Sequence, residues 1–246
     1  MSRYAMAVDL DLCVGCRACV VACKAENEAP VGVLRRRVVE VEGSNNSLAF
    51  LHNQCYHCVQ PPCIEVCPSG ATYQDDNGVV RLDREVCIGC GYCVPACPYE
   101  ARTYSGEVGF VHKCDMCAHR LAEGLPSACV EICPAQCLYY GDLDDPQSAI
   151  SQLLATKEGR VFRPDLGLDP KFFYVSARPE TVDLVFERLP VHQDALGSTK
   201  LWTDLTRPVS LLGIAGAVLV TAIAFPIARR NALAEARAHE EGESHD

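Results

Sequence analysis

The chain lacks several features that would assign it to other classes of protein. Residues 1–11 contain no apolar stretch of the kind that forms a secretory signal peptide. The chain has no extended basic run and a formal charge of −10, so we expect no nucleic-acid partner. No Ser/His/Asp set and no paired carboxylates stand out, and we therefore expect no catalytic residues.

What the chain has in excess is cysteine, with 17 among 246 residues. A disulfide framework is the ordinary explanation for so many, but the odd count, the missing signal peptide and the tight grouping oppose it. Sixteen of the cysteines form four groups of four, which we call quartets 1 to 4. Their members are Cys13, Cys16, Cys19 and Cys23; Cys55, Cys58, Cys63 and Cys67; Cys87, Cys90, Cys93 and Cys97; and Cys114, Cys117, Cys129 and Cys133.

Quartet 3 has the spacing that decides the chemistry. Its first three cysteines stand at every third position, and the fourth follows after three residues and precedes Pro98. This is the bacterial ferredoxin run, in which three thiolates hold one iron–sulfur cluster and the fourth ligates a second cluster. Quartet 1 has the same spacing. Each quartet is therefore predicted to be half of a two-cluster unit.

Quartets 2 and 4 depart from this spacing. Gln60–Pro62 widen the middle gap of quartet 2, and Ala118–Ala128 separate the second and third cysteines of quartet 4. Taken alone, quartet 4 also fits a zinc site made of two Cys pairs. Because it stands beside three ferredoxin-type quartets and ends in Cys133-Pro134, we predict a fourth half-site.

Three further features carry weaker expectations. The seventeenth cysteine, Cys137, belongs to no quartet and is predicted to be a small buried hydrophobe. His57 lies between two ligands and is expected to pack near a cluster rather than to bind iron. The Arg35–Arg37 run could dock a partner, but we expect a solvated strand face.

The remaining pattern predicts a mixed fold. Strands are expected at 4–10, at 78–83 and at 171–176, with a hairpin formed by 33–42 and 48–51 around the turn at 43–46. Asp145 and Pro146 predict the N-cap and first residue of a helix that ends at Gly159. Residues 177–200 are predicted to be a polar connector.

Residues 209–228 contain no charge and are long enough to cross the ~30 Å hydrocarbon layer. The stretch holds no His or Met, so it offers no haem ligand. Trp202 before it suits a membrane interface, and Arg229 and Arg230 after it favour a cytoplasmic tail. We expect a single-pass anchor in the cell inner membrane, with the cysteine-rich part on the periplasmic face.

The ordered spacings of all four quartets, over residues 4–142, resemble the iron–sulfur (beta) subunit of the dimethyl sulfoxide reductase superfamily. The resemblance implies that quartet 1 pairs with quartet 4 and quartet 2 with quartet 3, giving four [4Fe–4S] clusters at sites that we number I to IV. Some relatives replace one cysteine of quartet 3, but Cys90 is intact here. The implied ligands are Cys13, Cys16, Cys19 and Cys133 at site I; Cys23, Cys114, Cys117 and Cys129 at site II; Cys55, Cys58, Cys63 and Cys97 at site III; and Cys67, Cys87, Cys90 and Cys93 at site IV.

The expected fold class is α+β, with two ferredoxin-like double-cluster units, small β-hairpins and one C-terminal transmembrane helix. We expect an electron-transfer domain at 1–142, a helical and extended connector at 143–200, the anchor at 201–230 and a charged disordered tail at 231–246. The resemblance implies electron relay between a molybdenum or tungsten bis-pterin catalytic subunit and a quinone-reactive or cytochrome b membrane subunit.

The two ends of the chain resemble different branches of this family. Tyr174, Leu189-Pro190 and Leu201-Trp202, followed by one span, are similar to the tail of formate dehydrogenase beta subunits, which is the favoured assignment. Hydrogenase-associated subunits share that plan. The short hairpin between quartets 1 and 2 is similar to polysulfide, thiosulfate and tetrathionate reductase subunits. A membrane-tethered free ferredoxin is a further alternative.

Overall fold

A computed structural model describes residues 3–43 and 47–189, which belong to one compact unit. The predicted anchor at 209–228 and the tail at 231–246 lie outside the described residues. Among the helices that are described, none is both long enough and apolar enough to cross a membrane.

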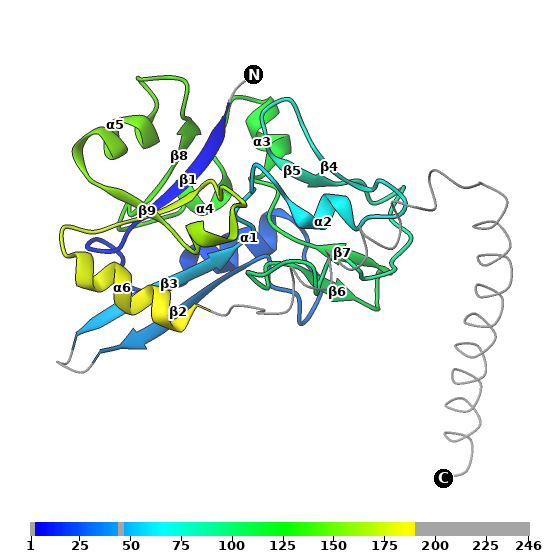
Figure 1. The fold of residues 1–246 in the computed structure, drawn as a ribbon, viewed down its shortest axis with the longest axis horizontal. Coiled ribbons are helices and arrows are strands. Elements are labelled where there is room, and N and C mark those ends of the chain that lie inside the picture. Colours follow the sequence, from blue (N-terminus) through cyan, green and yellow to red (C-terminus); the bar gives the residue numbers. More distant parts are fainter. Residues whose placement is uncertain (1–2, 44–46, 190–246) are drawn as a thin grey trace, which may run out of the picture. The chain divides into compact units, whose positions relative to one another are not determined.

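A four-stranded sheet joins distant parts of the chain, in the order β8–β1–β10–β9; Figure 1 labels β8, β1 and β9. Strand β1 (Tyr4–Asp9) pairs antiparallel with β8 (Leu138–Asp142) and parallel with β10 (Phe172–Val175), while β9 (Gly159–Val161) pairs with β10. Strand β1 is almost entirely buried because it has a partner on each side. The strands predicted at 4–10 and 171–176 are confirmed.

A two-stranded hairpin follows each of the first three quartets. Strands β2 (Arg36–Glu42) and β3 (Leu48–Gln54) follow quartet 1, β4 (Thr72–Gln74) and β5 (Val80–Leu82) follow quartet 2, and β6 (Thr103–Ser105) and β7 (Phe110–His112) follow quartet 3. The hairpin predicted between quartets 1 and 2 is confirmed, as is the strand predicted near 78–83. The fold is thus a repeated alternation of cysteine loop and hairpin.

Short helices carry the third cysteine of three quartets. Cys19 lies in α1 (Ala18–Glu26), Cys63 in α2 (Pro62–Glu65) and Cys129 in α4 (Ala128–Glu131), while α3 (Ala118–Ala122) fills the insertion of quartet 4. All three cysteines are buried on these helices. The helices therefore turn the third thiol of each of these quartets toward the interior.

The structure corrects two predictions about the second half of the chain. Helix α5 (Ala149–Thr156) begins later than predicted, because the Ser148 hydroxyl, not Asp145, accepts the hydrogen bond from the Ser151 backbone amide. Gly159 lies in β9 rather than at a helix end. Within the predicted connector, Pro179–Arg188 form a helix, α6, whose Val182 and Val185 are buried in the core at helical spacing.

Helix α6 packs along the hairpin of β2 and β3, and α5 packs beside β8 (Figure 1). The described part of segment 143–200 therefore packs on the cysteine-rich part through two strands of the central sheet and two helices.

Candidate functional site

The four cysteine loops share one backbone conformation. Two residues after the first cysteine of each quartet, the chain adopts a positive φ: 66° at Gly15, 47° at His57, 69° at Gly89 and 57° at Met116. A left-handed residue turns the chain sharply and can aim successive backbone amides at an anion. Glycine stands at this position only in quartets 1 and 3, so all four loops share the conformation although the sequence marks it in only two of them.

At site I, one hollow is lined by the four predicted ligands, Cys13, Cys16, Cys19 and Cys133, together with Cys137. The fourth cysteine of quartet 4 thus meets the first three of quartet 1. The pairing of β1 with β8 and the packing of α1 against α4 bring these segments together.

Site II is completed in the reverse direction, by the fourth cysteine of quartet 1. The Asn27 side-chain amide lies 3.8 Å from the Cys23 sulfur and 3.9 Å from the Cys117 sulfur. Burial raises the pKa of Cys23 to about 12, and the neighbouring Cys129 and Cys117 thiolates add to this. The pKa of Cys114 is raised in the same way by burial and by Cys23. The structure therefore brings together all four predicted ligands of site II.

Sites III and IV show the same exchange between quartets 2 and 3. Burial raises the pKa of Cys97 to about 12, with further contributions from the Cys63 and Cys55 thiolates. The pKa of Cys58 is raised by burial and by Cys55, Cys97 and Cys63. At site IV, the Cys67 and Cys90 thiolates add to the burial that raises the pKa of Cys93. The fourth predicted ligand, Cys87, lies on the loop that leads to Cys90.

The donor set fits a positively charged iron–sulfur core. Desolvation opposes the thiolate form at most of these positions, so four close thiolates are stable together only with a compensating positive centre. The described residues contain no group of three Cys, His, Asp or Glu side chains that could hold one metal ion. Each thiolate of a cubane cluster binds a different iron atom, so cluster ligands do not have to meet at one point.

Cys13 has an unusual set of neighbours. Hydrogen bonds with Cys137 and His52 lower the pKa of the Cys13 thiol to about 4, against the effect of burial. The His52 Nε2 atom lies 3.2 Å from the Cys13 sulfur, and the Cys137 sulfur lies 3.5 Å from that of Cys133. Cys137 is buried as predicted, but it touches two predicted ligands of site I, which the sequence pattern did not indicate.

The arginine run was wrongly predicted to face solvent. Arg35 and Arg36 are buried, and only Arg37 is partly exposed. Arg35 forms an ion pair with Asp115 at 2.7 Å, and Arg36 reaches the sulfur of Cys129 at 3.7 Å. One signal could have revealed Arg36, because it stands two residues before the buried Val38 on the same strand and so shares its face.

His57 is fully buried, as predicted for a packing residue. Its Nδ1 atom accepts a hydrogen bond from the Val80 backbone amide at 3.1 Å. Burial and the nearby Lys113 and Lys171 cations hold its pKa well below the usual range, so the ring is neutral.

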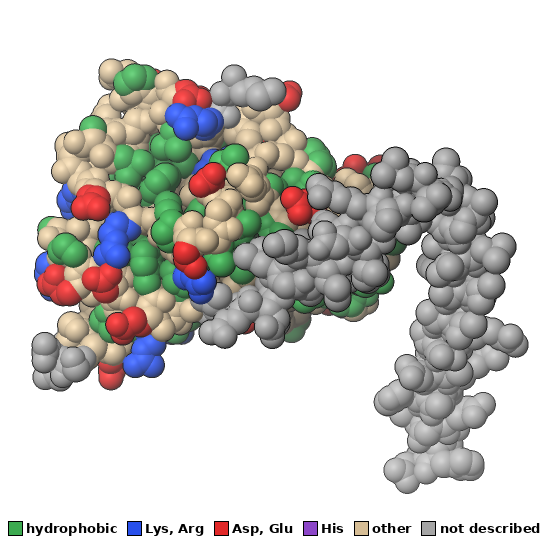
Figure 2. All heavy atoms as spheres, in the orientation of Figure 1, with side chains coloured by type: hydrophobic (Ala, Val, Ile, Leu, Met, Phe, Trp, Pro, Cys, Tyr) green, Lys and Arg blue, Asp and Glu red, His purple; other side chains and the backbone are tan. Residues whose placement is uncertain are grey.

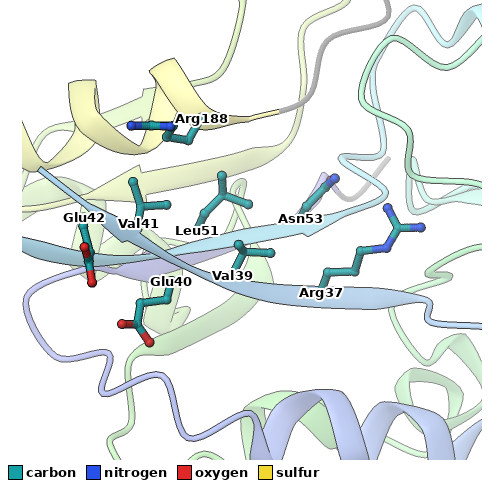
Figure 3. Close-up of a pocket in the computed structure, with 8 residues that line it drawn as sticks. All are labelled: Arg37, Val39, Glu40, Val41, Glu42, Leu51, Asn53 and Arg188. Carbon is teal, nitrogen blue, oxygen red and sulfur yellow. The ribbon is translucent and has the colours of Figure 1, made fainter.

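A separate hollow on the hairpin of β2 and β3 contains no cysteine. It lies beside α6, and Figure 3 shows the side chains that line it: Arg37, Val39, Glu40, Val41, Glu42, Leu51, Asn53 and Arg188. On the described part of the face drawn in Figure 2, acidic and basic side chains are interspersed.

Comparison with known families and proteins agrees with this geometry. Two family models, each described as a 4Fe-4S dicluster domain, match residues 12–71 and 46–143. The chain is 43% identical over 180 residues to a tetrathionate reductase subunit of Salmonella typhimurium, covering 70% of this chain and 72% of the relative. The chain belongs to the iron–sulfur subunits of the dimethyl sulfoxide reductase superfamily.

Other members of this family match over a similar length. A polysulfide reductase polypeptide of Wolinella succinogenes is 41% identical over 180 residues, covering 70% of this chain and 94% of the relative. The thiosulfate reductase electron transfer subunit of Salmonella typhi is 40% identical over 199 residues, covering 78% and 96%. Two dicluster domains give the four [4Fe–4S] clusters that the quartets predict.

Proposed function

We propose that the chain relays single electrons along a row of four clusters, I–II–III–IV, between two partners that dock at its ends. The observation that carries this proposal is the unequal exposure of the four cysteine loops. Val14 and Ile88, in the loops of quartets 1 and 3, are 63% and 64% exposed, and Cys16 and Cys90 beside them are exposed too. Tyr56 and Met116, in the loops of quartets 2 and 4, are each 1% exposed. Sites I and IV are thus the surface ends of the row, and sites II and III are its interior.

The chain's own residues hold the clusters and set their surroundings. When bound, each [4Fe–4S] cluster takes up and gives out one electron at a potential set by charge, hydrogen bonds to sulfur and solvent exposure. At site I, His52 and Cys137 contact the ligand sulfurs, and at site II Asn27 does so. The buried side chains of Tyr56 and Met116, in the loops of quartets 2 and 4, keep water from the interior sites.

For the catalytic partner we propose a subunit with a molybdenum or tungsten bis-pterin cofactor, as the family resemblance implies. The names of the relatives above, together with the short hairpin of β2 and β3, support a reductase for a sulfur compound such as tetrathionate, thiosulfate or polysulfide. Formate dehydrogenase is the second candidate, supported by the apolar stretch after Trp202. A quinone-reactive or cytochrome b subunit is the proposed membrane partner.

We further propose that residues 209–228 anchor the chain in the inner membrane, with the clusters on the periplasmic face. The support is the length of the uncharged stretch and the arginines that follow it. A chain truncated after Thr199 should be released from membranes by mild washing, whereas the full chain should require detergent. Release of both forms alike would contradict the anchor.

The relay is tested by anaerobic EPR on the native membrane complex. If a sulfur-compound reductase is the partner, clusters reduced by dithionite should be reoxidised by tetrathionate, thiosulfate or polysulfide and be unaffected by formate. Reduction of the clusters by formate would assign the chain to a formate dehydrogenase instead. Purification without a stoichiometric catalytic subunit would favour the tethered free ferredoxin, and a colourless protein without iron would contradict the relay.

A further inference from the structure

Five Arg and Lys side chains are buried in the described part of the chain, and the three least exposed lie among the cysteine quartets. Arg36 and Lys113 are each 2% exposed, and Arg102 is 3% exposed. Among the described residues, none of the three forms an ion pair with a carboxylate, in contrast to Arg35, which is paired with Asp115. A buried charge without a counter-charge is costly, so each of these cations requires an anionic partner.

Arg36 lies between the thiols of sites I and II. One guanidinium nitrogen is 3.7 Å from the sulfur of Cys129, a ligand of site II, and the positive charge of the guanidinium also acts on the thiol of Cys19, a ligand of site I. A second nitrogen donates to His52 Nδ1 at 2.6 Å. That bond leaves the His52 proton on Nε2, which then donates to the Cys13 sulfur of site I at 3.2 Å. The arginine therefore contacts site II directly and site I through His52.

Arg102 occupies the corresponding place between sites III and IV. Its guanidinium donates to the sulfur of Cys63 at 2.9 Å and to the Thr72 hydroxyl at 3.2 Å, and its positive charge also acts on the thiol of Cys93. Cys63 and Cys93 are the third cysteines of quartets 2 and 3, just as Cys19 and Cys129 are the third cysteines of quartets 1 and 4. The two arginines thus make equivalent contacts in the two double-cluster units.

Lys113 lies between the two units. Its ammonium group donates to the backbone carbonyl of Cys114 at 2.7 Å, on the side of site II. It also donates to the carbonyl of Val80, a residue that packs in one apolar cluster with Cys63 and Cys93. Burial lowers the pKa of this lysine, and the nearby Cys55 thiolate opposes that effect by favouring the charged form.

A row of four clusters has three gaps, and one buried cation lies in each. We propose that Arg36, Lys113 and Arg102 are shared counter-charges, each stabilising the reduced state of the two clusters on either side of it. Four thiolates outweigh the charge of the iron–sulfur core, so each site is net negative and gains one more negative charge on reduction. A cation between two such sites raises the reduction potential of both and lessens the repulsion between them. This inference requires the clusters but does not depend on which catalytic partner supplies or removes the electrons.

The test is an anaerobic, EPR-monitored redox titration of the native complex carrying Arg36→Gln, Lys113→Gln or Arg102→Gln. Each change removes one charge and keeps a hydrogen-bond donor. At a fixed ambient potential, the ratio of reduced to oxidised cluster should fall about tenfold at two clusters, a shift of about 59 mV toward lower potential. Arg37→Gln is the matched control, because it removes the same charge from the next residue of β2, whose side chain lines the hairpin hollow (Figure 3). It should shift no cluster to this extent.

The decisive result is the pattern of overlap among the four signals. The Arg36 and Lys113 variants should share one shifted cluster, the Lys113 and Arg102 variants should share another, and the Arg36 and Arg102 variants should share none. Unchanged potentials, a uniform shift of all four clusters, or an equal shift in Arg37→Gln would each overturn the proposal.

Iron and acid-labile sulfide content separates this role from a structural one. If a Gln variant loses clusters, the charge-keeping Arg36→Lys and Arg102→Lys variants replace it in the titration. They should hold all four clusters and shift the same pairs by a smaller amount, because the shorter ammonium group keeps the charge but loses the forked contacts. A Lys variant that shifts all four potentials alike, or that shifts clusters outside its own pair, would refute the assignment.

Discussion

Replacement of Gly15 by alanine tests the backbone repeat of the cysteine loops. Gly15 has a φ of 66°, and an L-residue in this left-handed region costs about 1–2 kcal/mol. The added Cβ would lie 2.1 Å from Cε1 of the Phe50 ring, whereas ordinary contact begins at 3.4 Å. Forcing extra volume into a packed site costs about 1–3 kcal/mol more. We therefore expect Gly15→Ala to destabilise the folded chain by about 2–5 kcal/mol.

Two other glycines of the cysteine loops separate the cost of the left-handed backbone from the cost of the steric clash. Gly91 has a φ of 71°, but its added Cβ would meet nothing within 4 Å, so Gly91→Ala should cost only about 1–2 kcal/mol. At Gly89 the added Cβ would lie 2.4 Å from the backbone carbonyl oxygen of Gly109. A backbone atom cannot rotate away as a ring can. Gly89→Ala should therefore cost at least as much as Gly15→Ala.

Truncation of Phe50 should relieve the clash that Gly15→Ala creates. In the Gly15→Ala/Phe50→Ala double variant the steric conflict is gone, so the double variant should be about 1–3 kcal/mol more stable than the sum of the single effects. The assay is anaerobic guanidinium unfolding, followed by far-UV circular dichroism and by cluster absorbance, with iron content measured on each variant. If Gly15→Ala costs no more than Gly91→Ala, or if Phe50→Ala gives no recovery, the steric argument is wrong.

Two further pairs of substitutions test contacts in the core and around site I. Tyr56 and Tyr174 share a hydroxyl hydrogen bond of 2.9 Å, and Tyr174 donates to the His52 carbonyl. Tyr174→Phe leaves the buried Tyr56 hydroxyl unsatisfied and should lower the free energy of unfolding by about 1–3 kcal/mol. Tyr56→Phe preserves the bond to His52 and should lower it less. Equal losses of stability in guanidinium unfolding would contradict this. At site I, Cys137→Ala should keep the full iron and sulfide content, whereas Cys133→Ala should lose the cluster there. A loss of iron in Cys137→Ala would make Cys137 a ligand.

Much of the fold around the clusters could be predicted from the sequence, because cysteine spacing is set by cluster geometry. Three thiols on one loop and a fourth on another require two loops to meet, and the structure brings quartet 1 to quartet 4 and quartet 2 to quartet 3. The strand at Tyr4–Asp9 and the hairpin of β2 and β3 follow from local pattern and turn residues. The parallel pairing of β1 with β10 does not, since it joins segments far apart in the chain.

Arg36 was missed because an arginine run usually faces water. The run Arg35–Arg37 before Glu40 and Glu42 is typical of a solvated strand face, and the face that Arg36 shares with Val38 was the one local sign that it points inward. The partners that make its burial tolerable, Cys19 and Cys129, are distant in sequence. Helix α6 was missed for a different reason, since its apolar residues Val182, Leu184, Val185 and Phe186 are interspersed with charged ones.

The repeat of quartet and hairpin accounts for where the cations lie. Arg36 begins the first strand after quartet 1, and Arg102 directly precedes the first strand after quartet 3, so both enter from equivalent positions. Lys113 stands immediately before quartet 4, and the equivalent residue before quartet 2 is Gln54, which is 1% exposed and whose amide has no hydrogen-bond partner among the described residues. The repeat thus provides two positions at the junction of the units, while a row of four clusters has only one gap there. Lys113 supplies the cation for that gap. A second charged side chain, at position 54, would be buried with no further pair of clusters to act as its counter-charge.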